Sequence, residues 1–328
     1  MRVGRNESAK VGGMNTISHP QAQAVAVHSF WGGFWRLADP KISLASIASM
    51  FLGACAAAAA GPLHLGWLAC TVIGILAIEI AKNASGELFD YDSGTDLAVE
   101  SIDRSPFSGG KRVLVDGLLT RGETRHIAVA GYAVGIGTGL MIVSVHGWVI
   151  FWIGLVGVAC ALFYHAPPVQ LAYRGLGEIA VALCYGPLIA TGTFYVQRGT
   201  MSPALLWTSM PLGLLIGAFL LINEFPDSKA DQRAGKRTLV VRYGRRKASI
   251  GFGLLMLMAF LTAGLLPLAG VPMGVLTGCV AAIPGFRASQ ILRRHHEVTR
   301  MMIPAQTQTL LTFVLYALSA GMGWLVLR

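Results

Sequence analysis

Acidic and amide side chains recur at helical spacing in two separate parts of the chain. The first group has intervals of 4, 4 and 3 residues: Glu79, Asn83, Glu87 and Asp90. The second group has intervals of 4 and 4 residues: Asn223, Asp227 and Asp231. Residues three or four apart lie on one face of a helix, so each group would form a single polar stripe. Like charges stacked in this way repel one another, and a bound cation would relieve the repulsion.

The oxygen donors of the two stripes suit Mg²⁺. This ion is hard, prefers carboxylate and water oxygens, and usually bridges to substrate phosphates. The expected metal ligands are Asn83, Glu87, Asp90, Asn223, Asp227 and Asp231. A single stripe has a plainer interpretation, as a helix end solvated by headgroup water. Two stripes of similar pattern, each followed by a basic loop, favour a ligand site.

A glycine and then a Lys-Arg pair follow each stripe. The first pair is Lys111 and Arg112, and the second is Lys236 and Arg237. Glycine lets the backbone approach an anion closely, and the two side chains add positive charge. Carboxylates that hold a metal, together with cations that neutralise phosphate, predict a diphosphate site. Either pair alone would also be explained as a determinant of membrane topology.

A third polar segment contains Tyr164, Arg174 and Glu178. Arg174 and Glu178 are four residues apart, so a helical ion pair is the plain interpretation. Alternatively, Tyr164 and Arg174 reach the same cavity as the two stripes. His165 has no partner pattern and receives no role.

The composition excludes an ordinary soluble protein. Hydrophobic residues make up 54% of the 328 residues, charged residues 13%, and the mean hydropathy is +0.60; soluble proteins have about 25% charged residues. The net charge of +10 does not indicate nucleic acid, because the basic residues lie in short loops between apolar runs. The five cysteines lie inside apolar runs without a CxxC pattern, which predicts neither a disulfide nor a zinc site.

The apolar runs predict an all-α bundle of nine transmembrane helices with cap loops on the cytoplasmic side. The spans are approximately 42–60, 65–89, 124–145, 147–165, 175–196, 203–223, 248–268, 271–288 and 306–327. We expect residues 36–328 to form this domain. Residues 1–35 would be a cytoplasmic tail without a cleaved signal peptide, containing an interfacial segment near 25–37.

The basic residues predict the orientation of the bundle. With the N-terminus inside, all but Arg198 and Arg328 of the 26 Lys and Arg residues face the cytoplasm. All 16 Asp and Glu residues also fall at that side. Positive residues favour cytoplasmic loops, so we expect a multi-pass protein of the cell inner membrane with a cytoplasmic N-terminus and an external C-terminus.

These motifs resemble those of the UbiA-type superfamily of intramembrane prenyltransferases, most closely its 1,4-dihydroxy-2-naphthoate polyprenyltransferase branch. The resemblance covers approximately residues 30–328. Its most specific part is Asp227-x-x-x-Asp231-x-x-x-Gly235-Lys236-Arg237-Thr238-Leu239, and the segments 107–110 and 173–178 also resemble that branch. The first motif is less regular, because Gly86-Glu87 stands where Asn-Asp is usual, with Asp90 and Asp96 as the later acids.

The resemblance implies Mg²⁺-dependent transfer of a polyprenyl group from its diphosphate to an aromatic acceptor within the lipid bilayer. For 1,4-dihydroxy-2-naphthoate, the transfer would be accompanied by decarboxylation and give a demethylmenaquinone. The implied catalytic residues are Asp90, Asp227, Asp231 and Lys236, and Asp96 joins the metal ligands. The implied diphosphate-binding residues are Lys111, Arg112, Arg174, Lys236 and Arg237. Arg36 and Tyr164 are candidates for contact with the acceptor, and Arg36 or Arg174 would pair with its carboxylate.

Two alternatives stay open at this point. The same chemistry could act on another acceptor: 4-hydroxybenzoate, homogentisate, a porphyrin or chlorophyll precursor, or a glycerol phosphate lipid. A protein of another class, an ion-coupled membrane transporter, also carries acidic residues in its helices. A transporter usually has its ion site near the bilayer midplane and shows repeated halves, whereas these acids gather at one face.

Overall fold

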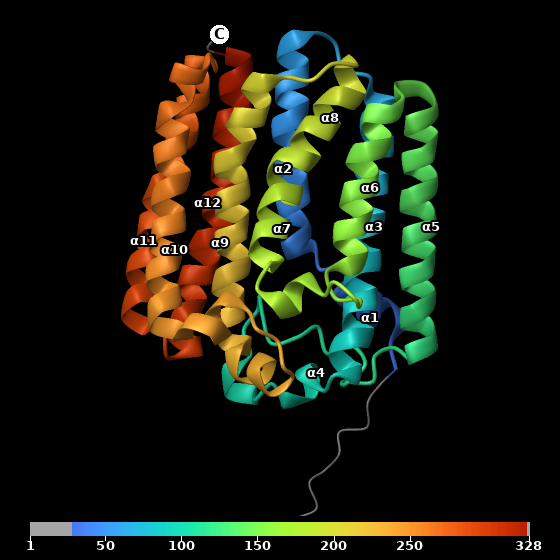
Figure 1. Ribbon diagram of the computed structural model, residues 1–328, viewed down its shortest axis with the longest axis vertical. Helices are drawn as coiled ribbons and strands as arrows, with labels where there is room; N and C mark the ends of the chain where they lie inside the picture. Colours follow the sequence, from blue (N-terminus) through green and yellow to red (C-terminus); the bar gives the residue numbers. More distant parts are fainter. Residues whose placement is uncertain (1–27, 327–328) are drawn as a thin grey trace, which may run out of the picture.

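The structure, a computed structural model, describes residues 28–326, and these residues form helices and no strands. The α-helices are α1 (Phe30–Ala38), α2 (Pro40–Ala60), α3 (Leu65–Asp92), α4 (Thr95–Ala98), α5 (Arg121–His146), α6 (Trp148–Phe163), α7 (Gly177–Leu183), α8 (Ile189–Arg198), α9 (Pro203–Arg233), α10 (Leu239–Leu265), α11 (Ala282–His295) and α12 (Thr299–Val326). The 3-10 helices are η1 (Ser101–Asp103), η2 (Leu171–Arg174), η4 (Leu266–Ala269) and η5 (Met273–Ala281), and η3 (Cys184–Leu188) is a π-helix. The predicted all-α bundle is confirmed (Figure 1).

Eight helical segments of the described chain are long and apolar enough to cross a membrane, against nine predicted. The difference is α6, which occupies the predicted span 147–165 and is apolar but has only 16 residues. At about 1.5 Å per residue it extends about 24 Å, less than the roughly 30 Å of a bilayer core. In Figure 1 it stands beside α3 and α5 as a full member of the bundle.

The outer surface of the bundle is apolar, as a lipid-facing surface must be. On α10, large side chains at helical spacing are exposed along one side: Leu254, Leu257, Met258, Leu261 and Leu265. The interior contains α9, which packs against α7, α10 and α12. Leu212, Leu215 and Phe225 of α9 have no exposed surface. The second acidic stripe therefore continues from the most enclosed helix of the bundle.

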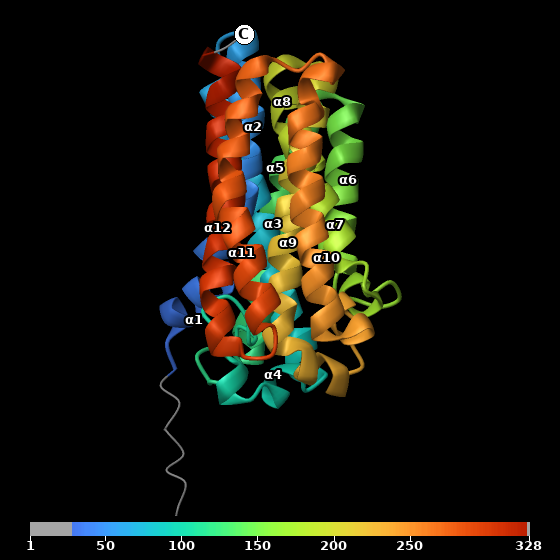
Figure 2. The same cartoon turned by 90° about the vertical axis from the view of Figure 1, so that its left-hand side faces the viewer.

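Polar loops gather at one end of the bundle, the lower end in Figures 1 and 2. Residues 93–120, which we call the cap, connect α3 to α5 there and include α4 and η1. Helix α1 lies at the same end and exposes Trp31 and Trp35, as suits a headgroup region. The predicted tail lies mostly outside the described residues, and so does Arg328. The described C-terminus is at the opposite end.

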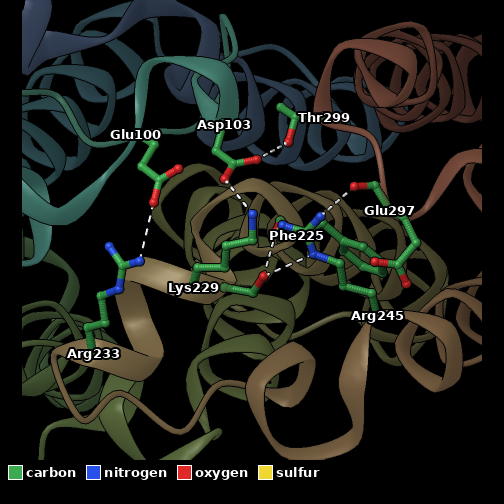
Figure 3. Close-up of polar contacts among 9 residues, drawn as sticks. Glu100, Asp103, Phe225, Lys229, Arg233, Arg245, Glu297 and Thr299 are labelled. Atoms are coloured by element: carbon green, nitrogen blue, oxygen red, sulfur yellow. Dashed lines mark hydrogen bonds and ion pairs between the residues drawn. The ribbon is translucent and has the colours of Figure 1, made fainter.

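Figure 3 shows how the cap is held against α9. Asp103 accepts a hydrogen bond from Thr299 at 2.8 Å and pairs with Lys229 at 3.3 Å, with its side chain only 10% exposed. Glu100 pairs with Arg233 at 3.2 Å in a more exposed position. Lys229 and Arg233 alternate along α9 with Asp227 and Asp231. The contacts to the cap therefore help to fix the helix that carries the second stripe.

Gly186 in η3 is required by close packing. A β-carbon at this position would lie 2.6 Å from Cα and 2.8 Å from the nitrogen of Gly213 in α9, both of which are backbone atoms that cannot move aside. We expect Gly186→Ala to destabilise the protein by about 1–3 kcal/mol, the usual cost of overpacking. Thermal unfolding in detergent should show a melting temperature several degrees lower. Gly137→Ala on α5 is the control, because its β-carbon would meet nothing within 4 Å; an equal loss there would contradict the packing explanation.

Asp103 is expected to contribute more to cap stability than Glu100. Asp103→Ala leaves the buried Thr299 hydroxyl without its acceptor, which costs about 1–3 kcal/mol. Glu100→Ala removes a pair whose side chains are 52% and 59% exposed, and such pairs contribute about 0–1 kcal/mol. Hydrogen exchange measured by mass spectrometry over 93–120 should rise severalfold for the Asp103 variant and little for the Glu100 variant. A larger effect of Glu100→Ala would show that the exposed pair holds the cap.

Candidate active site

The two acidic stripes meet at the side chain of Lys236. Its Nζ lies 2.7 Å from Oδ1 of Asp90 on α3 and 3.7 Å from Oδ1 of Asp231 on α9. Burial alone would lower the pKa of Lys236, but the two carboxylates outweigh it and hold that pKa above its usual value. The two motifs, far apart in the sequence, therefore share one buried cation.

The loop after α9 is shaped to return Lys236 to the stripe. Gly235 has a φ of 76°, in the left-handed region that favours glycine. The main-chain N–H of Lys236 then donates to the carbonyl oxygen of Asp231 at 2.8 Å. Its ammonium also lies over the Tyr173 ring, 5.3 Å from the centroid. The glycine in this motif thus has a local structural reason.

Asp96, in the short helix α4, adds a third carboxylate to the same region. It is 2% exposed, and the cap loop encloses it so closely that a side chain at Gly110 would collide with its carboxylate. Burial, and then the charges of Asp90 and Glu87, raise the pKa of Asp96 to about 8. Asp96 is therefore mostly protonated at pH 7, and another cation beside Lys236 would favour its charged form.

The donor set fits Mg²⁺. Among the described residues, buried carboxylate oxygens of Asp96 (Oδ2), Asp227 (Oδ1) and Glu224 (Oε2) have no hydrogen-bond partner. No three Asp, Glu, His or Cys side chains in that part of the chain converge on one point as a complete metal cage. Mg²⁺ does not need such a cage, because it commonly takes one or two carboxylates together with water and substrate phosphate oxygens. The unpartnered carboxylate oxygens at this site match that requirement.

Three of the predicted ligands have other partners. The side-chain amide of Asn83 donates to the carbonyl oxygen of Leu37 at 2.9 Å, and Glu87 accepts from the main-chain N–H of Leu114 at 2.8 Å. Asn223 accepts from Gln306 at 3.0 Å. These side chains tie the stripes to α1, the cap and α12. The structure thus brings Asp90 and Asp231 together at Lys236, with Asp96 and Asp227 in the same region and Asn83, Glu87 and Asn223 around them.

A polar cavity of about 710 Å³ lies between both stripes, the cap and α1. Lys111 and Arg112 line it, as predicted from their place behind the first stripe. Lys111 pairs with Asp39 at 2.7 Å. Arg36 also lines the cavity and pairs with Asp116 at 2.7 Å. The cavity therefore combines carboxylates and cations over a volume suited to a diphosphate and a small ring.

Arg174 and Arg237 are exposed and do not line this cavity. Arg174 donates to the carbonyl oxygen of Pro168 at 2.9 Å. The alternative ion pair of Arg174 with Glu178 is absent from the described residues, because Arg174 lies in η2 before the helix begins and Glu178 accepts from the N–H of Leu239. The four-residue spacing of Arg174 and Glu178 does not indicate a helical pair here, because α7 begins only at Gly177.

A second, apolar cavity of about 350 Å³ adjoins the polar one. It lies among α3, α5, α6 and the α7–η3–α8 segment, and its wall includes Ile75, Ile78, Ile150 and Ile153. Lys82 and Tyr164 line both cavities and so mark their junction. A substrate with a charged head and an apolar tail would match this arrangement.

His165 and Lys82 belong to the site although the sequence indicated a role for neither. His165 packs on Gly86, where a β-carbon would lie 2.7 Å from its Cε1. Its Nε2 is 3.9 Å from Asp90, yet burial lowers the pKa of His165 to about 4, so the ring is neutral near pH 7 and this contact is not an ion pair. The unusual glycine at position 86 was the only sequence signal for this contact.

The sequence model of the UbiA prenyltransferase family matches residues 46–302. The 1,4-dihydroxy-2-naphthoate octaprenyltransferase of Bacillus subtilis is 28% identical over 214 residues, which cover 65% of this chain and 67% of that protein. The protein of the same name from Mycobacterium tuberculosis is 29% identical over 274 residues, covering 80% of this chain and 87% of its own length.

The fold agrees with these similarities. A solved UbiA homologue from Archaeoglobus fulgidus, bound to GPP and Mg²⁺, superposes with a TM-score of 0.58 over 88% of this chain and 99% of its own, at 16% identity. At that identity the likeness concerns the fold alone. The family model covers most of the chain, and the predicted resemblance is confirmed: the protein belongs to the UbiA prenyltransferase family and is a membrane prenyltransferase.

Proposed function

We propose that the protein transfers a polyprenyl group from polyprenyl diphosphate to 1,4-dihydroxy-2-naphthoate. The observation that carries this proposal is the junction of the two cavities, since one suits a diphosphate and the other an apolar chain. The naphthoate is favoured because relatives that align over most of this chain act on it by name. The cytoplasmic side of an inner membrane is the proposed location of the polar cavity.

The proposed metal ligands are Asp90, Asp96, Asp227 and Asp231, with Asn83, Glu87 and Asn223 close by. Unpartnered carboxylate oxygens at this site support the proposal, as does the Mg²⁺ in the archaeal UbiA homologue. Bound Mg²⁺ would neutralise charge on the departing diphosphate.

The chain's own cations would share that task. Lys111, Arg112 and Lys236 are proposed to bind diphosphate oxygens and to stabilise the charge that develops as the leaving group departs. Arg174 and Arg237 are left out of this set because they are exposed outside the cavity. The apolar cavity would exclude water from the allylic cation.

The proposed reaction balances as follows. The bond between C1 of the prenyl chain and the diphosphate oxygen breaks, and diphosphate keeps the electron pair. The ring carbon that bears the carboxylate forms a bond to C1. Loss of CO₂ then returns an electron pair to the ring. The product is the reduced form of a demethylmenaquinone, and no oxidant is needed.

A direct assay tests this function. Purified protein in lipid with Mg²⁺ and a polyprenyl diphosphate should release pyrophosphate in the presence of 1,4-dihydroxy-2-naphthoate. A panel with 4-hydroxybenzoate, homogentisate and a glycerol phosphate lipid should give little or no release. Turnover of another acceptor alone would replace the proposed substrate, and turnover of none would overturn the proposal.

Asp227→Asn should lower turnover by about 10²–10³, the usual loss when one preorganised electrostatic contact is removed. The carboxylate is buried in the site, so the change removes charge at nearly constant volume. Asp92→Asn is the matched control, because Asp92 lies at the end of α3 but pairs with Arg121 in an exposed position. Wild-type turnover in a folded Asp227 variant would show that this carboxylate is not part of the metal site.

A further inference from the structure

Lys82 places a positive charge in the membrane-spanning helix α3, at the junction of the two cavities. Ionisable side chains within membrane spans are costly, and they generally face a cavity or a partner. Lys82 is partly buried, and its ammonium lies 5.1 Å from the centroid of the Tyr164 ring. An aromatic face stabilises a cation only modestly. The charge therefore needs another partner.

The described residues do not supply a carboxylate within ion-pair distance of Lys82, nor a hydrogen-bond acceptor for it. The nearest acid along its own helix is Glu79, one turn earlier. The two oxygens of Glu79 accept hydrogen bonds from Ser46 at 2.8 Å and from Tyr185 at 3.1 Å. Glu79 is thus held by hydroxyl groups in the wall of the apolar cavity.

The other cationic side chains that line the polar cavity differ from Lys82 in their partners or in their exposure. Three of them are paired with carboxylates: the exposed Arg36 and the more buried Arg112 with Asp116, and Lys111 with Asp39. Lys41 and Arg104 have no carboxylate partner either, but both are exposed and donate to main-chain carbonyls. Among the cavity-lining cations in residues 28–326, Lys82 alone is partly buried and has no carboxylate within ion-pair distance.

This position matters for the reaction. A diphosphate in the polar cavity and its chain in the apolar cavity place the reacting C1 near the junction, beside Lys82. An ammonium without an ion-pair partner there would repel the allylic cation. A negative group bound to Lys82 cancels that repulsion.

We propose that Lys82 is the specificity-determining anchor for the carboxylate of the aromatic acceptor. The inference rests on the proposed function, which it deepens by naming the recognised group. The attacked ring carbon bears that carboxylate, so anchoring the group sets the carbon beside C1. Tyr164, which lines both cavities, offers an aromatic face against which the acceptor ring packs.

The test compares acceptors that differ only in the carboxylate. Binding of 1,4-dihydroxy-2-naphthoate and of 1,4-dihydroxynaphthalene is measured by calorimetry on full-length protein in lipid nanodiscs, alongside KM and kcat. We expect Lys82→Gln to weaken binding of the naphthoate and raise its KM by tenfold or more. Binding of the uncarboxylated ring and the KM for the diphosphate should stay within twofold. Lys82→Arg should restore most of the naphthoate affinity.

Lys247→Gln on the exposed surface of α10 is the control for removal of a lysine charge and should behave as wild type. Melting temperature and gel filtration establish that each variant is folded. If Lys82→Gln instead raises the KM for the diphosphate, or weakens both rings equally, the anchor assignment is wrong. If Lys82→Gln misfolds, the test uses Lys82→Arg and the wild-type protein instead. Equal affinity of the wild-type protein for 1,4-dihydroxy-2-naphthoate and 1,4-dihydroxynaphthalene would overturn the anchor assignment.

Failure of the proposed function gives a different result. A wild-type protein that binds the naphthoate through Lys82 but turns over no acceptor would refute the transfer reaction and keep the anchor. A protein that transfers prenyl groups while Lys82→Gln leaves naphthoate affinity unchanged would refute the anchor and keep the reaction.

Discussion

The ion pairs of Lys236 with Asp90 and Asp231 hold together two helices that the bilayer alone would not orient toward each other. Apolar surfaces of α3 and α9 are satisfied equally by lipid or by another helix, so burial of apolar area does not select this arrangement. Buried charge does select it, because an isolated carboxylate in a low-dielectric interior is strongly disfavoured. Lys236 thus ties the loop after α9 to Asp90 on α3 and to Asp231 on α9.

The cavity follows from the same constraint. Both stripes turn their carboxylates inward, and the cap closes over them with its own ion pairs on the outer face of α9 (Figure 3). The resulting space is charged at the end of the bundle where the loops gather and apolar farther in. An amphiphilic substrate therefore has one orientation in which neither its charge nor its chain is in an unfavourable environment.

The sequence predicted the helices, both stripes and the first basic pair, because periodicity and charge are local properties. It misjudged Arg174, whose spacing to Glu178 crosses a helix start. Lys82 and His165 were missed because their importance depends on what lies across the cavity. Asn83 and Asn223, predicted as metal ligands, also form hydrogen bonds to neighbouring helices, and these contacts depend on the three-dimensional packing.

The contact between Gly86 and His165 makes two distant positions depend on each other. The imidazole occupies the space that any larger residue at position 86 would need, and that residue would reach the ring before it reached Asp90. An asparagine at position 86 would therefore require the imidazole of His165 to shift, or a smaller residue at position 165. The residues at positions 86 and 165 are thus sterically coupled, and the shape of the irregular first motif depends on a side chain almost 80 residues away in the sequence.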